Sequence, residues 1–170
     1  IGTLGIKSKK YKKNLSNTTI DPIQLSKILN KLKKQNINNV IMEASSHGLS
    51  QNRLDGLLFN TGIFTNLSQD HLDYHKNTKN YLKAKLYLFE KLIKTKGTII
   101  TDEKIPEFKK IKNIATNKNL NLFTLLDKKN NFQFLSHQYE HESQLLEIKY
   151  KNSIHKIKLN LIGKVQFKNV

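Results

Sequence analysis

Side chains that can bind metals, transfer protons or recognise anions gather in one stretch, from Ile41 to His75. Within it, the short apolar runs Val40–Met42 and Gly62–Thr65 are typical of buried parallel strands. In open α/β sheets, ligands bind beyond the carboxyl ends of such strands, so polar residues there predict a site. Those residues are Glu43, Ser45, Ser46 and His47 after the first run, and Asn66, Asp70 and His71 after the second.

Carboxylates and imidazoles in this stretch could act as metal ligands or as acid–base groups. The candidates are Glu43, Asp70, His71, Asp73 and His75. Oxygen ligands with an occasional imidazole suit Mg²⁺ or Mn²⁺, and the chain has no cysteine to supply a thiolate. One alternative is that Asp70 and Asp73 cap the following turn while the histidines lie at the surface. A second is a hydrolase triad of Ser46, His71 and Asp73, although no G-x-S-x-G sequence accompanies it.

Gln51 and Arg53 occupy alternating positions, so in an extended loop both would point toward the same ligand. Arg53 is the only arginine, whereas lysine supplies the other basic charges. A planar guanidinium can hold a carboxylate or phosphate through two hydrogen bonds, which lysine cannot do. We therefore expect Arg53 to bind an anionic ligand. Asn17, Thr18 and Thr19, just before a predicted helix, could hold an anion or a sugar.

The helices that position these residues have recognisable starts. Asp21 followed by Pro22 predicts a helix that runs to about Gln35. Its expected buried residues are Ile23, Leu25, Ile28, Leu29 and Leu32. A second helix is expected to begin with Asn77 or Thr78 as its cap and to continue through Lys94.

Lys85 stands out within the second helix. At about 100° per residue, the apolar side chains lie within about 60° of it, while other lysines lie opposite. These apolar residues are Tyr81, Leu82, Leu88, Phe89 and Leu92. Lys85 could simply extend its ammonium to a nearby polar edge. Alternatively, burial lowers the pKa of a lysine and leaves a neutral amine that can be covalently modified.

The remaining pattern predicts an α/β fold. Strands are expected at Gly97–Ile100 and Asn121–Leu126, with a helix at Pro106–Ala115 between them. Near the end, Leu146–Tyr150 and Ile154–Leu159 alternate on either side of a turn and predict an antiparallel hairpin. The fold class is therefore α/β, with a mostly parallel sheet and an antiparallel addition.

Length and charge limit the function classes. The 170 residues suggest one domain, and no signal peptide or long apolar run appears, so we expect a cytoplasmic protein. Both ends suggest a piece of a longer chain. The net charge of +17 leaves a basic nucleic-acid-binding module as an alternative. Its lysines are dispersed without the interleaved aromatics of single-strand binders, so we expect no nucleic-acid partner.

Three segments together resemble the Mur ligase family. They read MEASSHGLSQNR from Met42, FTNLSQDHLDYH from Phe64, and YLKAK from Tyr81. The S-S-H-x-L-x-Q-x-R element is similar to that of the members that add the third amino acid to the peptidoglycan precursor, and differs from folylpolyglutamate synthetase. The resemblance implies the family's three-layer central ATPase domain across residues 1–170.

The resemblance also implies roles for individual residues. The positions matching those that hold UDP-MurNAc-L-Ala-D-Glu are Asn17, Thr18, Thr19, Ser45, Gln51 and Arg53. Glu43 and His71 match Mg²⁺ ligands. Lys85 matches a lysine that is carbamylated and then helps to position the metal, so Glu43, His71 and Lys85 are the expected catalytic group. The implied reaction uses ATP to form an acyl phosphate, which the amine of a diamino acid attacks.

Some family features are missing from these residues. None of the seven glycines belongs to a G-x-x-G-K-[ST] phosphate loop, so we expect the fragment to be inactive alone. Thr101-Asp102-Glu103 and Val165–Asn169 only loosely match the segments near the adenine. The amino-terminal UDP-binding domain and the carboxy-terminal domain are also expected to lie elsewhere. The diamino acid is expected to be meso-diaminopimelate, with L-lysine or a folylpolyglutamate-synthetase-like reaction as alternatives, and the protein is expected to be a monomer.

Overall fold

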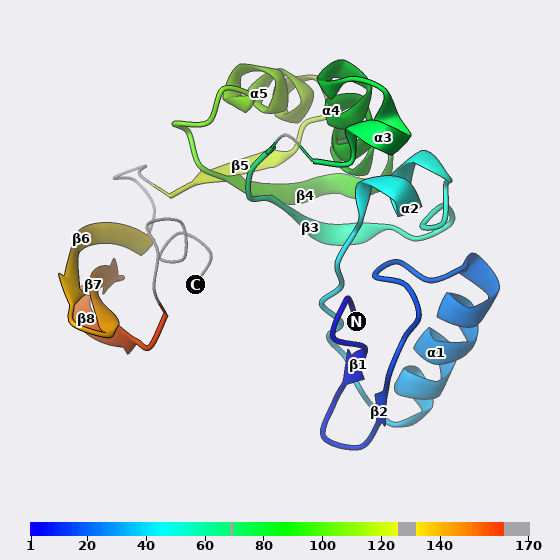
Figure 1. Cartoon of the computed structure of the whole chain (residues 1–170), viewed down its shortest axis with the longest axis horizontal. Helices are drawn as coiled ribbons and strands as arrows, with labels where there is room; N and C mark the ends of the chain where they lie inside the picture. The colour runs from blue at the N-terminus through cyan, green and yellow to red at the C-terminus, as the bar shows by residue number, and fades with distance from the viewer. Residues whose placement is uncertain (69, 126–131, 162–170) are drawn as a thin grey trace. The chain divides into compact units, whose positions relative to one another are not determined.

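The computed structural model describes residues 1–68, 70–125 and 132–161, with the side chain of Phe132 excepted. The chain divides into two compact units, one made of Ile1–Asn60 with Leu67–Lys94 and the other of Thr61–Asn66 with Thr95–Val170. The residues expected to bind the substrate or the metal belong to the first unit, whereas Asn66, also named from the sequence, belongs to the second. Figure 1 shows the elements of both units along the chain.

The first unit carries the helices that position the candidate site. Its elements are β1 (Ile6–Lys7), β2 (Lys12–Lys13), α1 (Pro22–Lys34), α2 (Ser46–Ser50), α3 (Leu72–His75), α4 (Thr78–Tyr87) and the π-helical turn η1 (Leu88–Leu92). Its core joins residues from the first strand, α1, α2 and η1. These core residues are Ile6, Ile20, Leu25, Ile28, Leu32, Leu49, Leu54 and Leu92.

Helix α1 begins as predicted. The Asp21 side chain accepts a hydrogen bond from the Gln24 amide at 2.9 Å, and Pro22 occupies the first turn, where its missing N–H costs nothing. The apolar stripe buries Leu25, Ile28 and Leu32, but Ile23 is 68% exposed. The expectation that Ile23 is buried was therefore wrong, because at about 100° per residue Ile23 lies nearly opposite the stripe formed by the buried leucines and Ile28.

The predicted strand at Val40–Met42 is absent, and Ile41 is 88% exposed. Among residues 1–68, 70–125 and 132–161, the backbone of this segment pairs with Ile1 alone. The Ile1 nitrogen donates to Ile41 O at 2.8 Å, and its carbonyl accepts from Glu43 N at 2.9 Å. This is the bonding pattern of a single parallel β-bridge, which is too short to form a strand. The segment still delivers Glu43 and Ser45 to the start of α2.

Helix α4 begins where its cap predicted, because Asn77 Oδ1 accepts from Asn80 N at 2.8 Å. It ends at Tyr87, earlier than expected, and η1 leads directly into β4. Lys85 is partly buried between two buried neighbours, Ala84 and Leu86. Apolar packing therefore covers more of this helix than the stripe expected from the sequence.

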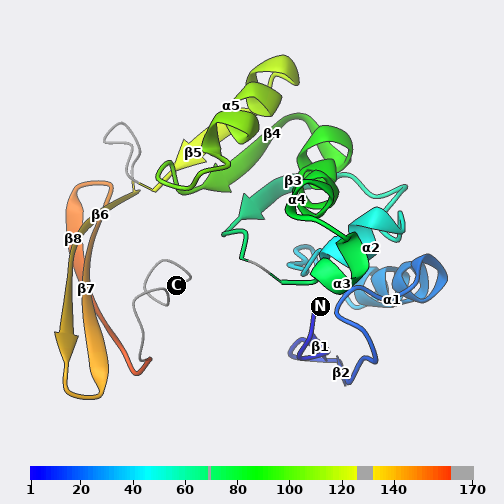
Figure 2. The ribbon, with the colours of Figure 1, turned by 45° about the horizontal axis from the view of Figure 1, so that its top comes forward.

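The second unit contains two sheets. The elements here and at its boundary are β3 (Phe59–Phe64), β4 (Ile93–Thr101), α5 (Phe108–Asn117), β5 (Asn121–Thr124), β6 (Phe132–Glu140), β7 (Ser143–Tyr150) and β8 (Ser153–Leu159). Strands β3, β4 and β5 form a parallel sheet in that order, and α5 packs against β5 (Figure 2). This confirms the expected α/β class. Leu126, the predicted end of β5, lies outside the described residues.

The antiparallel sheet confirms the predicted hairpin and adds a strand. Tyr150 pairs with Ser153, so the turn consists of Lys151 and Asn152, and β6 pairs with the other edge of β7. Opposite charges face each other across β7 and β8, where Lys156 Nζ lies 3.1 Å from Glu147 Oε1. The sequence did not predict β6, whose alternation is interrupted by a bulge between Phe134 and Ser136.

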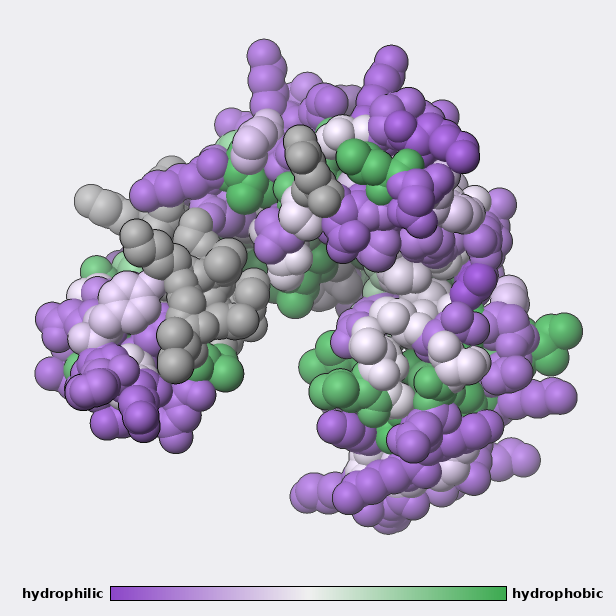
Figure 3. All heavy atoms as spheres, viewed as in Figure 1, coloured by the Kyte–Doolittle hydropathy of each residue, from purple (hydrophilic) through white to green (hydrophobic). Residues whose placement is uncertain are grey.

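Hydrophilic side chains cover much of the face seen in Figure 3, as the dispersed lysines lead one to expect. In the described part of the chain, each helix is too short or too polar to cross a bilayer.

Candidate functional site

Thr19 is the buried centre of the candidate site and is only 3% exposed. Its hydroxyl donates to the Glu43 carbonyl at 3.1 Å and accepts from the Ser45 amide at 2.9 Å. One threonine therefore fixes the backbone on both sides of Ala44. Thr19 and Ser45, which the sequence placed in one ligand site, are adjacent in the structure.

Gly48 lets α2 approach Thr19 closely. A Cβ on Gly48 would lie 2.5 Å from Thr19 Cγ2, a distance that real Cβ atoms essentially never show. Helix α2 is short but capped, because Ser45 Oγ accepts from Gly48 N at 3.1 Å. The cap and the glycine together place the end of α2 near Thr19.

Arg53 bonds to two other residues of the predicted site. Its Nη1 donates to Thr19 O at 2.7 Å, and its Nε donates to Gln51 Oε1 at 2.9 Å. A second bond to Gln51 Oε1 comes from Nη2 at 2.5 Å. Since a guanidinium has five N–H groups, these three bonds orient the fork and leave two donors for a ligand.

The sequence predicted that Gln51 and Arg53 point toward one ligand from an extended loop; in the structure the two side chains bond to each other, and the extended loop was wrong. The residues do not form an extended loop. Gln51 is the C-cap of α2, and Arg53 lies in the turn that follows. The Ser45 cap favours a helical turn here, which alternating positions alone could not reveal.

Glu43 is held by a residue that the sequence analysis missed. Thr3 donates to Glu43 Oε2 from its hydroxyl at 2.6 Å and from its amide at 3.0 Å. These bonds hold the pKa of the Glu43 carboxyl below its ordinary value, led by the hydroxyl bond. Because the Thr3 hydroxyl donates its proton to Glu43, the Thr18 hydroxyl donates to Thr3 Oγ1 at 3.0 Å. Thr18 thus joins the group around Glu43.

A cluster of three histidines and two tyrosines joins α2, α3 and α4. The His47 ring centroid lies 4.9 Å from that of His71 and 4.1 Å from that of Tyr74. His75 stacks on Tyr81 at 5.1 Å. The segments that follow the two predicted strands therefore do meet, as expected, but through rings rather than through carboxylates.

His75 is a structural member of this cluster. It is 5% exposed, and its Nε2 lies 2.9 Å from Ser46 Oγ. Burial lowers the pKa of His75, with smaller contributions from the nearby His47 and His71. Because Ser46 is itself buried and pairs with His75, the alternative triad of Ser46, His71 and Asp73 is not formed.

The predicted metal ligands have different hydrogen-bond and ring partners. Glu43 belongs to the group with Thr3 and Thr18, whereas His71 contacts His47 and approaches Asp70 Oδ2 at 3.5 Å. Within residues 1–68, 70–125 and 132–161, no three His, Cys, Asp or Glu side chains gather as metal ligands. The ammonium of Lys85 lies 5.2 Å from the Tyr81 ring centroid, on the side of the cluster formed by α4.

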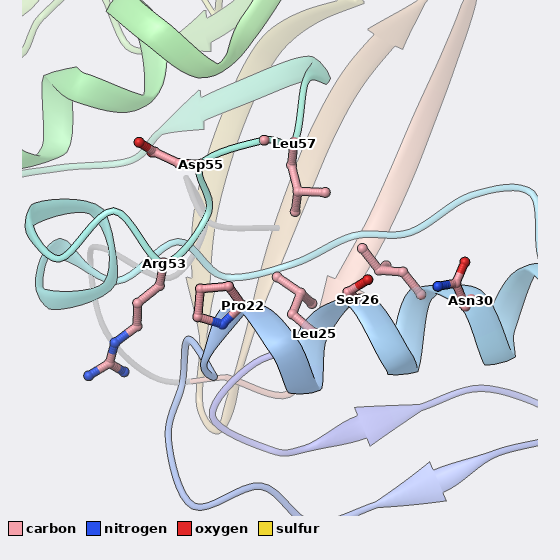
Figure 4. A pocket seen from close by; sticks show the side chains of 9 residues that line it. Pro22, Leu25, Ser26, Asn30, Arg53, Asp55 and Leu57 are labelled. Carbon is pink, nitrogen blue, oxygen red and sulfur yellow. The ribbon is translucent and has the colours of Figure 1, made fainter.

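Asn17 is exposed and contacts Ser16 at 3.5 Å, at the edge of the site. A pocket of about 330 Å³ lies nearby, between α1 and the turn after Arg53. In Figure 4, Arg53 and Asp55 point away from Leu25 and Leu57, which also line the pocket. The charged groups beside this pocket are therefore directed elsewhere, and we do not assign it to the site. The Val165–Asn169 segment lies outside the described residues.

Comparison with known proteins places this domain among the ligases. The chain belongs to the Mur ligase family, since the model described as the Mur ligase middle domain matches residues 1–170.

Two relatives are both named UDP-N-acetylmuramoyl-L-alanyl-D-glutamate–2,6-diaminopimelate ligase. The one from Zymomonas mobilis is 35% identical over 169 residues, covering 99% of this chain and 35% of the relative. The one from Wigglesworthia glossinidia brevipalpis is 48% identical over 124 residues, covering 70% and 25%. A solved structure titled as the same ligase has a TM-score of 0.76 at 25% identity and covers 99% of this chain and 34% of that one. The chain thus spans about a third of the length of such relatives.

Proposed function

We propose that this chain is the central part of an ATP-dependent ligase that joins meso-diaminopimelate to UDP-MurNAc-L-Ala-D-Glu. The observation that carries the proposal is the array in which Arg53 bonds to Gln51 and Thr19, on a chain of this family. The names of the relatives favour diaminopimelate over L-lysine as the added amino acid. We further propose that the protein is a monomer and that it acts in the cytoplasm, where ATP is available.

In the proposed reaction, the γ-phosphoryl group of ATP is transferred to the D-glutamyl carboxylate. ADP leaves, and the carboxylate becomes an acyl phosphate. The amine of the diamino acid then attacks the acyl carbon, phosphate departs, and the amine loses a proton as the amide forms. Arg53 has two N–H groups that suit an anionic part of the nucleotide-sugar substrate. Thr18, Ser45 and Asn17 would supply further neutral polar groups to the substrate, and Thr19 fixes the backbone on both sides of Ala44.

We assign Glu43, His71 and carbamylated Lys85 as ligands of Mg²⁺. The Glu43 carboxyl has a lowered pKa, and oxygen ligands with one imidazole suit this ion. A carbamate on Lys85 adds the further oxygen ligand that unmodified lysine lacks. Magnesium, when bound, spreads the negative charge that develops during phosphoryl transfer.

The test uses the protein encoded by the full reading frame around this chain. We expect ADP release that requires UDP-MurNAc-L-Ala-D-Glu and meso-diaminopimelate together, with less release when L-lysine replaces the diamino acid. UDP-MurNAc-L-Ala, which lacks the accepting glutamate, is the matched control and should give none. Ligation of glutamate to a folate substrate, or no ligation at all, would refute the proposal.

Residues 1–170 alone should not catalyse ligation, because they contain no phosphate-loop sequence. Measurable ligation by this segment would contradict that expectation.

A further inference from the structure

Tyr74 is a neighbour of the substrate-binding array that the proposed function does not use. Its hydroxyl oxygen lies 3.0 Å from Gln51 Nε2 and 3.1 Å from Ser50 Oγ. Tyr74 belongs to α3, which lies beside α2 in both views (Figures 1 and 2). Gln51 thus has Arg53 on one side of its amide and Tyr74 on the other.

The chemistry of the partners fixes the direction of each bond. Because arginine has only donors, the oxygen of the Gln51 amide faces Arg53, and its nitrogen donates to Tyr74. The Ser50 hydroxyl donates to the His47 carbonyl at 3.0 Å. The Tyr74 hydroxyl therefore donates to Ser50 and accepts from Gln51. Each hydroxyl in this chain of bonds uses its one proton.

The position of Tyr74 is itself held from two sides. Its ring packs on His47 at 4.1 Å between centroids, and the next residue, His75, bonds to Ser46. Adjacent residues of α3 therefore contact both ends of α2, His75 at Ser46 and Tyr74 at Ser50. This leaves the Tyr74 hydroxyl a fixed acceptor rather than a mobile surface group.

We propose that Tyr74 is a positioning residue for the nucleotide-sugar substrate, which holds the Gln51 amide and, through it, the Arg53 guanidinium. The inference rests on the proposed function, because that function assigns Gln51 and Arg53 to the substrate. Without the Tyr74 hydroxyl, the Gln51 amide loses the partner that fixes its nitrogen. Arg53 then keeps only Thr19 as a fixed acceptor, so both side chains must be ordered when the substrate binds.

The decisive variant is Tyr74→Phe in the protein encoded by the full reading frame. We expect the Kd for UDP-MurNAc-L-Ala-D-Glu, measured by calorimetry, and its KM to rise by about 3- to 10-fold, the range for one hydrogen bond. The kcat and the KM for ATP should change by less than about twofold, because Phe keeps the ring that packs on His47 and loses only the hydroxyl that bonds Gln51 and Ser50. Tyr87→Phe is the matched control. It removes a hydroxyl that bonds Asp55 at 3.0 Å, away from Gln51, and should leave these constants unchanged.

A double-mutant cycle separates positioning from general packing. In a Gln51→Ala background, Tyr74→Phe should add no further loss of affinity, since the amide that it positions is gone. Three results would each overturn the positioning role. The first is an unchanged Kd in Tyr74→Phe, and the second is a loss of affinity from Tyr74→Phe that is as large in the Gln51→Ala background as in the wild-type protein. The third is a fall in kcat as large as the rise in KM. Binding without ligation in the unmodified protein would refute the proposed function but still allow this test. Absence of substrate binding would refute both.

Discussion

Gly48 and Thr19 approach so closely that a Cβ on the glycine would lie 2.5 Å from Thr19 Cγ2. Thr19 is buried and bonds to Glu43 and Ser45, so it cannot move aside without breaking those contacts. The glycine is therefore part of the site although it offers no functional group.

We expect Gly48→Ala to lower the free energy of unfolding by about 1–3 kcal/mol, the range for overpacking a filled position. Denaturant unfolding of the full-length protein measures this change. Ser26→Ala, at an exposed position of α1, is the control and should change the free energy of unfolding by less than about 0.5 kcal/mol. Equal stability of Gly48→Ala and the unmodified protein would show that Thr19 can shift freely.

Arg53→Lys should weaken binding of the nucleotide-sugar substrate while preserving charge. Lysine cannot reach Gln51 and Thr19 with a planar fork, so we expect a rise in KM of about 10- to 100-fold, as for lost charge-assisted bonds. The KM for ATP should stay within about twofold, because Gln51 and Thr19 are proposed to hold the nucleotide-sugar substrate and not ATP. Lys31→Arg, an exposed change over the Tyr11 ring, controls for the exchange itself. A variant with normal substrate KM would remove Arg53 from the proposed site.

Thr3→Val should change how stability depends on pH. Thr3 lowers the pKa of Glu43, so its stabilising effect is present above the ordinary pKa of a glutamate and is lost as the pH falls through the lowered pKa. The variant should therefore melt at a lower temperature at neutral pH and approach the unmodified protein in acid. The difference should be small because Glu43 is exposed.

Melting temperatures across the acidic range provide the measurement. Thr116→Val is the control, since its hydroxyl bonds a helix carbonyl rather than a carboxylate. A stability difference that stays constant down to the lowest pH would argue against the Thr3–Glu43 coupling.

Lys85→Arg should abolish ligation, because a guanidinium keeps the charge but cannot form the proposed carbamate. The activity of the wild-type protein should fall in buffer depleted of carbon dioxide and return when bicarbonate is added. Lys83→Arg changes an exposed lysine on the same helix and should retain activity. Native mass or density that shows unmodified Lys85 in an active, magnesium-bound enzyme would contradict the carbamate.

Local signals predicted the elements whose causes are local. Asp21 and Asn77 cap their helices, and the alternation around Lys151 and Asn152 gives a two-residue hairpin turn. The residues of Val40–Met42 suit a strand, but whether they form one depends on pairing partners distant in sequence. In the part of the chain that the structure describes, Ile1 alone pairs with this segment, so the prediction failed there.

The site was predicted in part for the same reason. The unique arginine drew attention to Arg53, and its spacing from Gln51 grouped the two residues. The bonds from Thr3 and Tyr74, in contrast, join residues 40 and 23 positions away. No spacing rule connects such pairs.

The π-helical turn η1, between Lys85 and β4, holds one residue more than the corresponding α-helical turn. The extra residue changes the direction in which the chain enters β4 at Ile93, while α4, which carries Lys85, keeps its rotation about the helix axis. Removing one residue from Leu88–Leu92 should therefore tighten the turn into an α-helix and leave the direction of Lys85 unchanged, whereas a deletion within α4 would rotate the lysine out of the ring cluster.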